Sequence, residues 1–549
     1  FGNIYLEVDP IENLTLRSSI GGQYNTFYYK DYNYRYLGDS EPEASNSFSE
    51  GTGYSFSWVF SNTASYKLKL NKHAATIFGG IEALNTGVGR NIAGSGINPF
   101  SMDLDYVNLS VVQNPIVNSS LFSGVNFYSL FGKVDYSFND KYYVTALVRR
   151  DGSSRFGDNK KYANFGSVGA SWIISDESFM SGLKSGFLDE LKIKASYGSA
   201  GNQSGLNDFQ SRELYGRGVY NGVSGLIQNN LANPELQWER KTTFNAGIEF
   251  STFKGRFSGA LEYYNSLTTD LFLNKQLSRT TGNRSLASNI GELQNKGVEA
   301  SLNFGVVKSK NFTWDINASL TYNDNIVRKL EDGQNEIING IFINRIGESL
   351  NSFYVVPTAG VNPANGNQQY RKLDGSLTET LDADDRIIAG ESQIPYFGGF
   401  GTTLSYKGFS LNTFFSFVSG NKIFNNDRTN VVFPFYYFDN LAAENLREWR
   451  NPGDITDVPR FDNVFESNTT RFVESGNFLR LRNATFSYQV PDKFLQKTKI
   501  GSIKLFVQGQ NIYTWHKFLG YDPEIFGGIN NGAQYPALRT FTAGLNIGL

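Results

Sequence analysis

The sequence predicts an all-β protein: a transmembrane antiparallel up-and-down β-barrel of which about 17 strands are present. Three observations lead to this prediction. Phe, Tyr and Gly account for 45, 31 and 56 of the 549 residues, beside only 2 Met, and this balance favours strands over helices. Apolar and polar residues alternate with a period of two along many segments. Short connections between these segments alternate with long ones along the chain.

The alternation is clearest in the segment 314–322. Its even-numbered positions are Trp314, Ile316, Ala318, Leu320 and Tyr322, and polar residues occupy the positions between them. Successive side chains of a strand point to opposite faces, so one face of this strand is apolar and the other is hydrophilic. The same pattern recurs in 191–197 and 243–250. The charged residues that we expect to face a hydrated lumen are Lys192, Lys194, Glu299 and Asp315.

The connections between the predicted strands fall into two classes. Short turns are expected near 9–13, 71–73, 139–141, 252–255, 308–311 and 406–408. Long loops are expected near 30–51, 85–125, 200–239, 267–296, 324–394, 420–477 and 516–536. Because the two classes alternate, one end of the molecule carries tight turns and the other carries large loops. This asymmetry is typical of outer-membrane barrels, which have short periplasmic turns and long extracellular loops, and not of β-sandwiches.

The strand count predicts that the chain is part of a larger barrel. Bacterial single-chain barrels have an even number of strands, and about 17 is odd. The first strand, 2–8, leads into a short turn, so it would start at the extracellular end, where a complete barrel does not begin. The composition is nearly uniform, and no Pro-rich or Ser-rich linker divides the chain. We therefore expect residues 1–549 to form the C-terminal part of one barrel in a Gram-negative outer membrane.

The composition also excludes several classes of protein. No segment approaches the ~18 consecutive apolar residues of a membrane-spanning helix. A barrel strand, in contrast, needs only ~9–11 residues and exposes alternate ones to lipid. The chain contains no Cys, which excludes disulfides and thiolate metal sites. The net charge of −2 leaves no basic patch that would bind nucleic acid.

The sequence does not support an enzyme. Membrane-barrel hydrolases use a His paired with Ser or Asp, and only His73 and His516 are available. His73 lies in the predicted short turn 71–73, and His516 lies where a strand enters the predicted long loop 516–536. The two residues are thus expected at opposite ends of the barrel, where they cannot share a metal ion. We interpret both as residues at strand boundaries.

An acidic cluster in the loop 324–394 is a candidate calcium site. Asp382, Asp384 and Asp385 follow an Asp-Gly pair at Asp374, and Ca²⁺ prefers carboxylate oxygens. An ordered calcium loop also needs a Gly at its sharp turn and a closing Glu at fixed spacing, and neither is present at the required position. A solvated turn is the favoured interpretation, with calcium as the alternative, and we expect no other cofactor.

The run RRDGSSR at 149–155 surrounds an Asp-Gly pair with charges of both signs. Asp-Gly is a common turn sequence, and neighbouring ion pairs can stabilise a turn. This run predicts a hairpin tip held by its own ion pairs rather than a ligand site.

Aromatic residues in the loop 420–477 are the candidate ligand contacts. They are Phe433, Phe435, Tyr436, Tyr437, Phe438 and Trp449. Sugar rings stack on exposed aromatic faces, and peptides dock on them too. A small hydrophobic core within the loop, or a contact with a partner protein, explains the same residues equally well.

Several segments resemble one family, the SusC/RagA-type TonB-dependent outer-membrane transporters of Bacteroidota. The resembling segments are FNDKYY at 138–143, RRDGSSRFG at 149–157, LKIKASYGSAGNQ at 191–203, NPELQWE at 233–239, NKGVEASLNF at 295–304, YFGGFGTTLSYKGFSLN at 396–412, FLRLRNATFSYQVP at 478–491, GQNIYTWHKFLGYDPE at 509–524 and YPALRTFTAGLNI at 535–547. They occur in the family's order and span almost the whole chain.

The resemblance implies a 22-stranded barrel closed by an N-terminal plug. The plug, the segment that contacts TonB and the first strands would then precede this sequence. The resemblance also implies a SusD-type surface lipoprotein as partner, import energised through TonB, and oligosaccharide or peptide cargo. The sequence does not identify the cargo or the residues that bind it.

Three alternatives remain open at this point. A SusC-like barrel can serve as a structural subunit of a larger outer-membrane complex, without coupling between ligand and TonB. A surface adhesin or lectin would be extracted without detergent. A barrel hydrolase would lose activity when either histidine is replaced.

Overall fold

The computed structural model describes residues 1–34, 45–101, 103, 105–122, 124–184, 186–283, 285–331, 333–432, 440–461, 467–496, 500–530 and 535–548. The described chain divides into two compact units. Unit 1 comprises 1–170, 196–242 and 268–290, and unit 2 comprises 171–195, 243–267 and 291–549. Five strands pass from one unit into the other: β8 (Tyr162–Ile173), β9 (Leu188–Asn202), β12 (Glu239–Thr252), β13 (Phe257–Gln276) and β14 (Ser285–Lys308).

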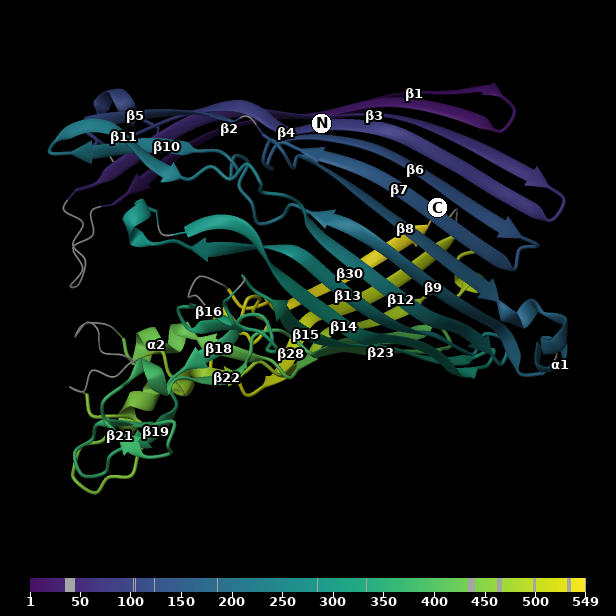
Figure 1. Cartoon of the computed structure of the whole chain (residues 1–549). Coiled ribbons are helices and arrows are strands. Elements are labelled where there is room, and N and C mark those ends of the chain that lie inside the picture. Colours follow the sequence, from purple (N-terminus) through teal and green to yellow (C-terminus); the bar gives the residue numbers. More distant parts are fainter. Residues whose placement is uncertain are drawn as a thin grey trace. The chain divides into compact units, whose positions relative to one another are not determined.

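Unit 1 is built from long antiparallel strands that pair in chain order (Figure 1). These strands are β1 (Gly2–Ile11), β2 (Leu14–Asn33), β3 (Ser47–Leu70), β4 (His73–Ile97), β6 (Asn126–Phe138), β7 (Tyr142–Ser153) and β8 (Tyr162–Ile173). The strand β5 (Gln113–Phe122) pairs with β4 beyond the stretch of β4 that pairs with β6. A separate hairpin is formed by β10 (Leu214–Tyr220) and β11 (Val223–Asn230).

Unit 2 continues the same pattern with a second run of paired strands. After β14 come β15 (Phe312–Lys329), β23 (Tyr396–Tyr406), β24 (Phe409–Ser419), β27 (Phe478–Gln489), β28 (Ser502–His516) and β30 (Thr540–Gly548). Among the described residues, 18 strands belong to the large antiparallel sheet. One of them, β5, pairs only with the far end of β4, beyond the stretch that pairs with β6. The other 17 strands form the continuous antiparallel series, and this confirms the expected count of about 17.

The long connections of unit 2 carry secondary structure of their own. Their small sheets comprise β16 (Glu336–Asn339), β17 (Phe342–Arg345), β18 (Ser352–Val355), β19 (Thr358–Val361), β20 (Gln368–Arg371), β21 (Leu377–Thr378), β22 (Ile387–Glu391), β25 (Lys422–Asn425), β26 (Val473–Ser475) and β29 (Ile529–Asn530). Phe353, Phe424, Val432 and Phe472 form a buried cluster there. The predicted loops 324–394 and 420–477 are therefore folded segments with a hydrophobic core.

Helices are short throughout the described chain. The α-helices are α1 (Ser181–Lys184) and α2 (Asn426–Val432), and the 3-10 helices are Leu109–Val111, Ile174–Asp176, Ser178–Met180, Arg279–Thr281, Ala383–Asp385, Ala443–Arg447, Thr470–Phe472 and Asp492–Phe494. None of the helices in these ranges is long and apolar enough to cross a membrane.

Tight turns connect the strands at the predicted positions. They occupy 12–13, 71–72, 139–141, 253–256, 309–311 and 407–408. Asn13, Asn71 and Asn139 have φ of 68°, 53° and 55°, and Gly408 has φ of 92°. This left-handed region suits Asn and Gly best, so the turn residues match the conformation that a tight turn requires.

One face of the sheet is apolar and exposed, so many apolar side chains of the strands are not buried. In unit 1 this apolar face carries Leu6, Leu16, Phe60, Ile81 and Leu130, all at least two-fifths exposed. The opposite face carries Arg17 paired with Glu7 and Lys133 paired with Asp135. Exposing one apolar face is unfavourable in water and favourable in lipid.

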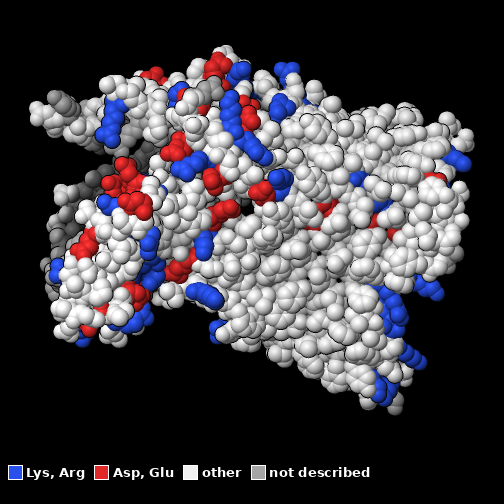
Figure 2. All heavy atoms as spheres, turned by 60° about the horizontal axis from the view of Figure 1, so that its bottom comes forward, with Lys and Arg blue, Asp and Glu red and all other residues white. Residues whose placement is uncertain are grey.

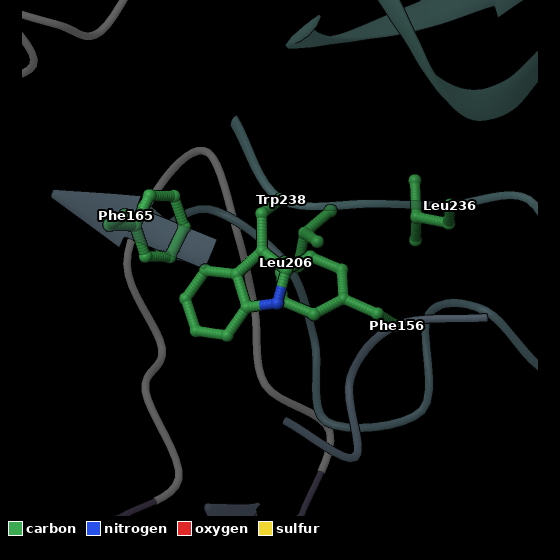
Figure 3. Close-up of a cluster of buried hydrophobic side chains, with 5 residues drawn as sticks. All are labelled: Phe156, Phe165, Leu206, Leu236 and Trp238. Atoms are coloured by element: carbon green, nitrogen blue, oxygen red, sulfur yellow. The ribbon is translucent and has the colours of Figure 1, made fainter. Parts of the chain in front are cut away.

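A compact aromatic cluster lies at the loop end of unit 1. It consists of Phe156, Phe165, Leu206, Leu236 and Trp238, with Trp238 between Phe165 and Phe156 (Figure 3). The rings of Phe156 and Trp238 are 4.6 Å apart, and the Trp238 indole N–H donates to the Lys161 carbonyl at 3.1 Å. The segment NPELQWE thus contributes to a local core that ties the 154–161 turn to the strand β12.

Candidate functional site

The best-defined candidate site is a cavity of about 230 Å³ among the connections of unit 2. One wall comes from Asp427 in α2, and the rest comes from the segment between β28 and β30. The lining residues are Asp427, Tyr521, Asp522, Glu524, Ile525, Phe526, Asn530, Tyr535 and Ala537. Pockets for whole drug-sized ligands are usually about 300–1,000 Å³, so this cavity suits one side chain or part of a sugar ring.

A buried arginine fixes the two carboxylates between β28 and β30. Arg480 in β27 is 1% exposed. Its guanidinium donates to Glu524 Oε2 at 2.8 Å and to Thr514 Oγ1 on the paired strand β28 at 2.8 Å, and it also donates to Asp522 Oδ1. Burying a charge is costly unless it is paired and hydrogen-bonded, and here the guanidinium has three partners. Arg480 thereby holds the segment between β28 and β30 against β27 at Asp522 and Glu524.

Asp522 stays ionised in this setting. Burial acts to raise the pKa of its carboxyl, but the N–H groups of Ala537 and Glu524, at 3.0 and 2.9 Å, and the Arg480 guanidinium oppose that effect. The net result is a pKa below the usual Asp range. Hydrogen bonds to the charged form of a carboxyl favour that form. The Asp522 carboxylate is therefore ionised at neutral pH and paired with the Arg480 guanidinium.

Three aromatic side chains of the cavity are almost fully exposed. Tyr521, Phe526 and Tyr535 are 81%, 84% and 93% exposed. Large exposed rings next to hydrogen-bonding groups are suited to stack on sugar rings or on the side chains of a peptide. The sequence had predicted such a role for aromatic residues of the loop 420–477, whereas these three lie in the predicted loop 516–536. The same criterion, aromatic residues within a long loop, would have found them.

The predicted aromatic contacts are only partly described. Phe433, Phe435, Tyr436, Tyr437 and Phe438 lie outside the described residues. Trp449 packs over the turn at Gly366, where an added Cβ would come within 2.4 Å of its ring. Its indole N–H donates to the Pro363 carbonyl at 3.0 Å. Trp449 thus holds the loop 420–477 against the loop 324–394, and its role in binding a ligand stays a prediction.

The acidic cluster uses its carboxylates within the loop. Asp382 caps the 3-10 helix Ala383–Asp385 by accepting from the Asp384 N–H at 3.0 Å. Asp385 accepts from the Leu373 N–H at 3.1 Å. Within the described ranges, no group of three or more His, Asp or Glu is arranged to hold a metal ion. These contacts fit the solvated turn favoured by the sequence.

The two histidines make local contacts. His73 begins β4 directly after a two-residue turn, and its Nδ1 lies 2.7 Å from the Tyr136 hydroxyl. His516 ends β28, and its Nδ1 lies 2.9 Å from the Phe518 carbonyl. Both residues are at strand boundaries, as predicted.

The run RRDGSSR is not a hairpin tip, and this corrects the sequence prediction. Residues 149–153 belong to β7, which continues to Ser153. Arg149 pairs with Asp151 at 2.6 Å, as expected, but Arg155 pairs with Asp208 outside the run at 2.9 Å. The Asp-Gly pair continues as a strand because Asp151 and Gly152 pair with Ser129 and Tyr128 of β6.

Ion pairs line the polar face of unit 2. Lys194 pairs with Glu249 at 2.7 Å and also with Glu262, and Lys192 pairs with Glu249 at 3.3 Å. The predicted lysines thus lie on one polar face with acidic partners on β12 and β13. In Figure 2, a broad area of the face in view carries almost no charged residue, and Lys, Arg, Asp and Glu gather beside it.

Long antiparallel strands with one exposed apolar face and one charged face define a transmembrane β-barrel, and the comparisons with known proteins identify its family. Residues 3–512 match the family described as "TonB dependent receptor-like, beta-barrel". The chain belongs to this family, whose members are outer-membrane receptors rather than enzymes.

Among curated relatives, the chain is 31% identical to the TonB-dependent receptor P3 of Formosa agariphila, over 88% of this chain and 52% of that protein. It is 28% identical to the TonB-dependent receptor SusC of Bacteroides thetaiotaomicron, over 76% of this chain and 43% of SusC. The chain spans about half the length of the curated relatives it matches.

A solved structure described as the RagAB peptide transporter is similar along 99% of this chain and 61% of that chain, with a TM-score of 0.87 and 28% identity. This match confirms the predicted barrel fold and the resemblance to SusC and RagA.

Proposed function

We propose that the protein containing this chain imports oligosaccharides or peptides across the outer membrane of a Gram-negative cell. Import would be energised through TonB, and a SusD-type surface lipoprotein would assist it. The observation that supports this proposal most is the likeness to the RagAB peptide transporter along 99% of the chain. The plug and the TonB contact that such import needs are expected in the remainder of the protein.

The cavity between β28 and β30 supports a role in capturing cargo. Its exposed rings offer stacking surfaces, and its carboxylates offer hydrogen-bond acceptors for sugar hydroxyls or peptide N–H groups. Arg480 and Arg482 hold the Glu524 carboxylate in place. A site with fixed acceptors loses less entropy when cargo binds, which favours recognition.

The polar face of unit 2 supports a role in passage. Lys192, Lys194, Glu249 and Glu262 pair with one another at side-chain exposures between 28% and 35%. Because each charge has a partner, the surface stays hydrated without attracting cargo of one sign strongly. A wide barrel has a lumen that must be plugged at rest, so the proposal requires a plug that moves.

Uptake by cells tests this proposal. A strain that lacks the gene is complemented with the full-length protein and offered fluorescently labelled oligosaccharides and peptides. The expected result is uptake of one of the two classes that disappears when a protonophore collapses the proton-motive force. If the full-length protein supports no energised uptake but is required for another outer-membrane complex to assemble, it is a structural subunit instead.

A further inference from the structure

The apolar face of unit 1 contains a groove of about 650 Å³. It crosses β1, β2, β3, β4 and β6. One row of directly paired residues runs across it: Leu6, Ser18, Asn62, Ile81 and Leu130. The next row contains the small residues Ala64 and Gly79. The aliphatic side chains form the walls of the groove, and the small residues form its floor.

The groove contains two polar side chains in an otherwise apolar setting. Along β3, the residues on this face are Tyr54, Phe56, Trp58, Phe60, Asn62, Ala64, Tyr66, Leu68 and Leu70. Asn62 is the single amide in this series, and Ser18 is directly paired with it. A polar side chain among residues that face lipid is costly unless it finds a hydrogen-bond partner.

Neither side chain finds that partner in the described part of the chain. The Ser18 hydroxyl and the Asn62 carboxamide make no hydrogen bond there. On the opposite face, in contrast, the neighbouring residues Ser19 and Ser61 bond to each other at 3.0 Å. The groove therefore offers three polar hydrogens to whatever occupies it, one from the hydroxyl and two from the amide.

Ser18 and Asn62 lie at a depth in the membrane that matches the ester groups of a lipid. Ser18 follows the turn at 12–13 by five residues. A strand rises about 3.3 Å per residue and is tilted by about 45° in a barrel, so Ser18 lies roughly 12 Å from the level of that turn. Because the turn reaches into water, the pair lies near the border between head groups and hydrocarbon.

We propose that this groove binds one diacyl lipid of the outer membrane. Its acyl chains lie along Leu6, Leu16, Ile81 and Leu130, and an ester carbonyl accepts hydrogen bonds from Ser18 and Asn62. An ester lipid combines an acceptor with flexible hydrocarbon, which matches the aliphatic walls and the two donors. The volume is within the range of about 300–1,000 Å³ typical of ligand pockets. The proposal rests on the outer-membrane location and not on the identity of the cargo.

Native mass spectrometry of the full-length protein in detergent micelles tests the proposal. The probe is dioleoyl phosphatidylethanolamine, compared with its dialkyl ether analogue, which lacks the ester carbonyls. We expect one ester lipid to bind per chain, and the ether lipid to bind roughly three- to tenfold more weakly, as expected for the loss of about one hydrogen bond.

Two substitutions test separately the hydrogen-bond donor of Asn62 and the volume of the groove at Gly79. Asn62→Leu is expected to weaken the ester lipid part of the way to the level of the ether lipid, because the Ser18 hydroxyl remains as a donor, and to leave the ether lipid unaffected. Gly79→Leu is expected to weaken both lipids, because the added side chain fills the floor. An added Cβ at Gly79 comes no nearer than 3.4 Å to any other group, so the backbone tolerates it. Ala75→Leu lies on the same face outside the groove and is the matched control.

Some outcomes would overturn the proposal. Equal binding of ester and ether lipids by the parent protein would remove the role of the polar pair. Equal lipid binding by the parent protein, Gly79→Leu and Ala75→Leu would mean that lipid binds elsewhere. A dimer that dissociates with Gly79→Leu and not with Ala75→Leu would assign the groove to a second copy of the chain.

Discussion

At the scale of single residues, the chain holds its long connections with paired charges that are buried or half-buried. Arg428 pairs with Glu444 at 2.8 Å and with Glu474 at 3.1 Å, and Arg480 pairs with Asp522 and Glu524. The sequence shows these residues but not their pairing, because the partners are 16 to 46 positions apart. Only the folded chain brings them together.

Replacing Arg480 tests the strength of this arrangement. Arg480→Met leaves Asp522 and Glu524 without their main cation, and removing one partner of a buried pair costs about 3–5 kcal/mol. We expect the free energy of unfolding to fall by about 3 kcal/mol in urea titrations of the full-length protein in detergent. The control is Arg447→Met, which breaks an exposed pair with Asp457 and should cost less than about 1 kcal/mol. Equal effects of the two substitutions would contradict this account.

Glu379 gives a prediction about pH. The amides of Asn367, Asn362 and Asn365 donate to its carboxylate and lower its pKa below the usual Glu value. A carboxyl with a lowered pKa in the folded state stabilises that state above its unfolded pKa, and this contribution is lost as the pH falls through the folded pKa. The loop 362–379 should therefore hold its order at neutral pH and lose it only below the ordinary Glu range.

Hydrogen exchange measures this effect. We expect Glu379→Gln to accelerate amide exchange in 362–367 several-fold at pH 7, while the same substitution at the exposed Glu235 leaves that segment unchanged. In the parent protein, exchange corrected for intrinsic rates should rise in 362–367 as the pH drops below about 4. Unchanged protection in both experiments would show that the three amides do not order the loop.

At the scale of elements, alternation and turn chemistry predicted the strands and the short turns. The segment 314–322 lies within β15, and all six short turns occur where Asn, Gly or neighbouring polar residues indicated them. The lengths were harder to predict. β3 has 24 residues and β4 has 25, well beyond the ~9–11 that span a bilayer. Where these strands extend beyond the membrane, both faces of the sheet are in water and apolar residues no longer alternate with polar ones. The sequence therefore predicted loops at the ends of β3 and β4.

The two faces of β15 allow a matched test. Ala318→Arg places a charge at the centre of the apolar face, which costs about 2–4 kcal/mol at the middle of a bilayer. Asn317→Arg places the same charge one residue away on the polar face. We expect only the first substitution to lower the free energy of unfolding in liposomes by that amount. Similar losses at both positions would mean that this strand does not separate lipid from water.

At the scale of the whole molecule, the resemblance predicted the family, and the family match over 3–512 confirms it. The candidate site was less predictable. The sequence pointed to long loops and their aromatic residues, but it could not show which rings would be exposed. Which rings are exposed depends on how the long connections pack around small hydrophobic cores. One such core contains Phe353, Phe424 and Phe472, which lie far apart along the chain.

The exposed aromatic residues give a prediction about cargo. Replacing Tyr521, Phe526 and Tyr535 together with Ala should weaken cargo binding by roughly tenfold or more, because each stacked ring contributes about 0.5–1.5 kcal/mol. Binding is measured by calorimetry on the full-length protein with the oligosaccharide or peptide that cells take up. Folding should be unaffected, since these rings are 81% or more exposed. Unchanged affinity would place the cargo site elsewhere in the loops.

Energised uptake is the most direct test of the central claim. Cells that express the full-length protein are compared with cells that lack it, and with cells whose TonB is deleted, using the same labelled cargo. We predict uptake only when both the protein and TonB are present. Uptake that continues without TonB, or no uptake of either cargo class in any of the strains, would contradict the account.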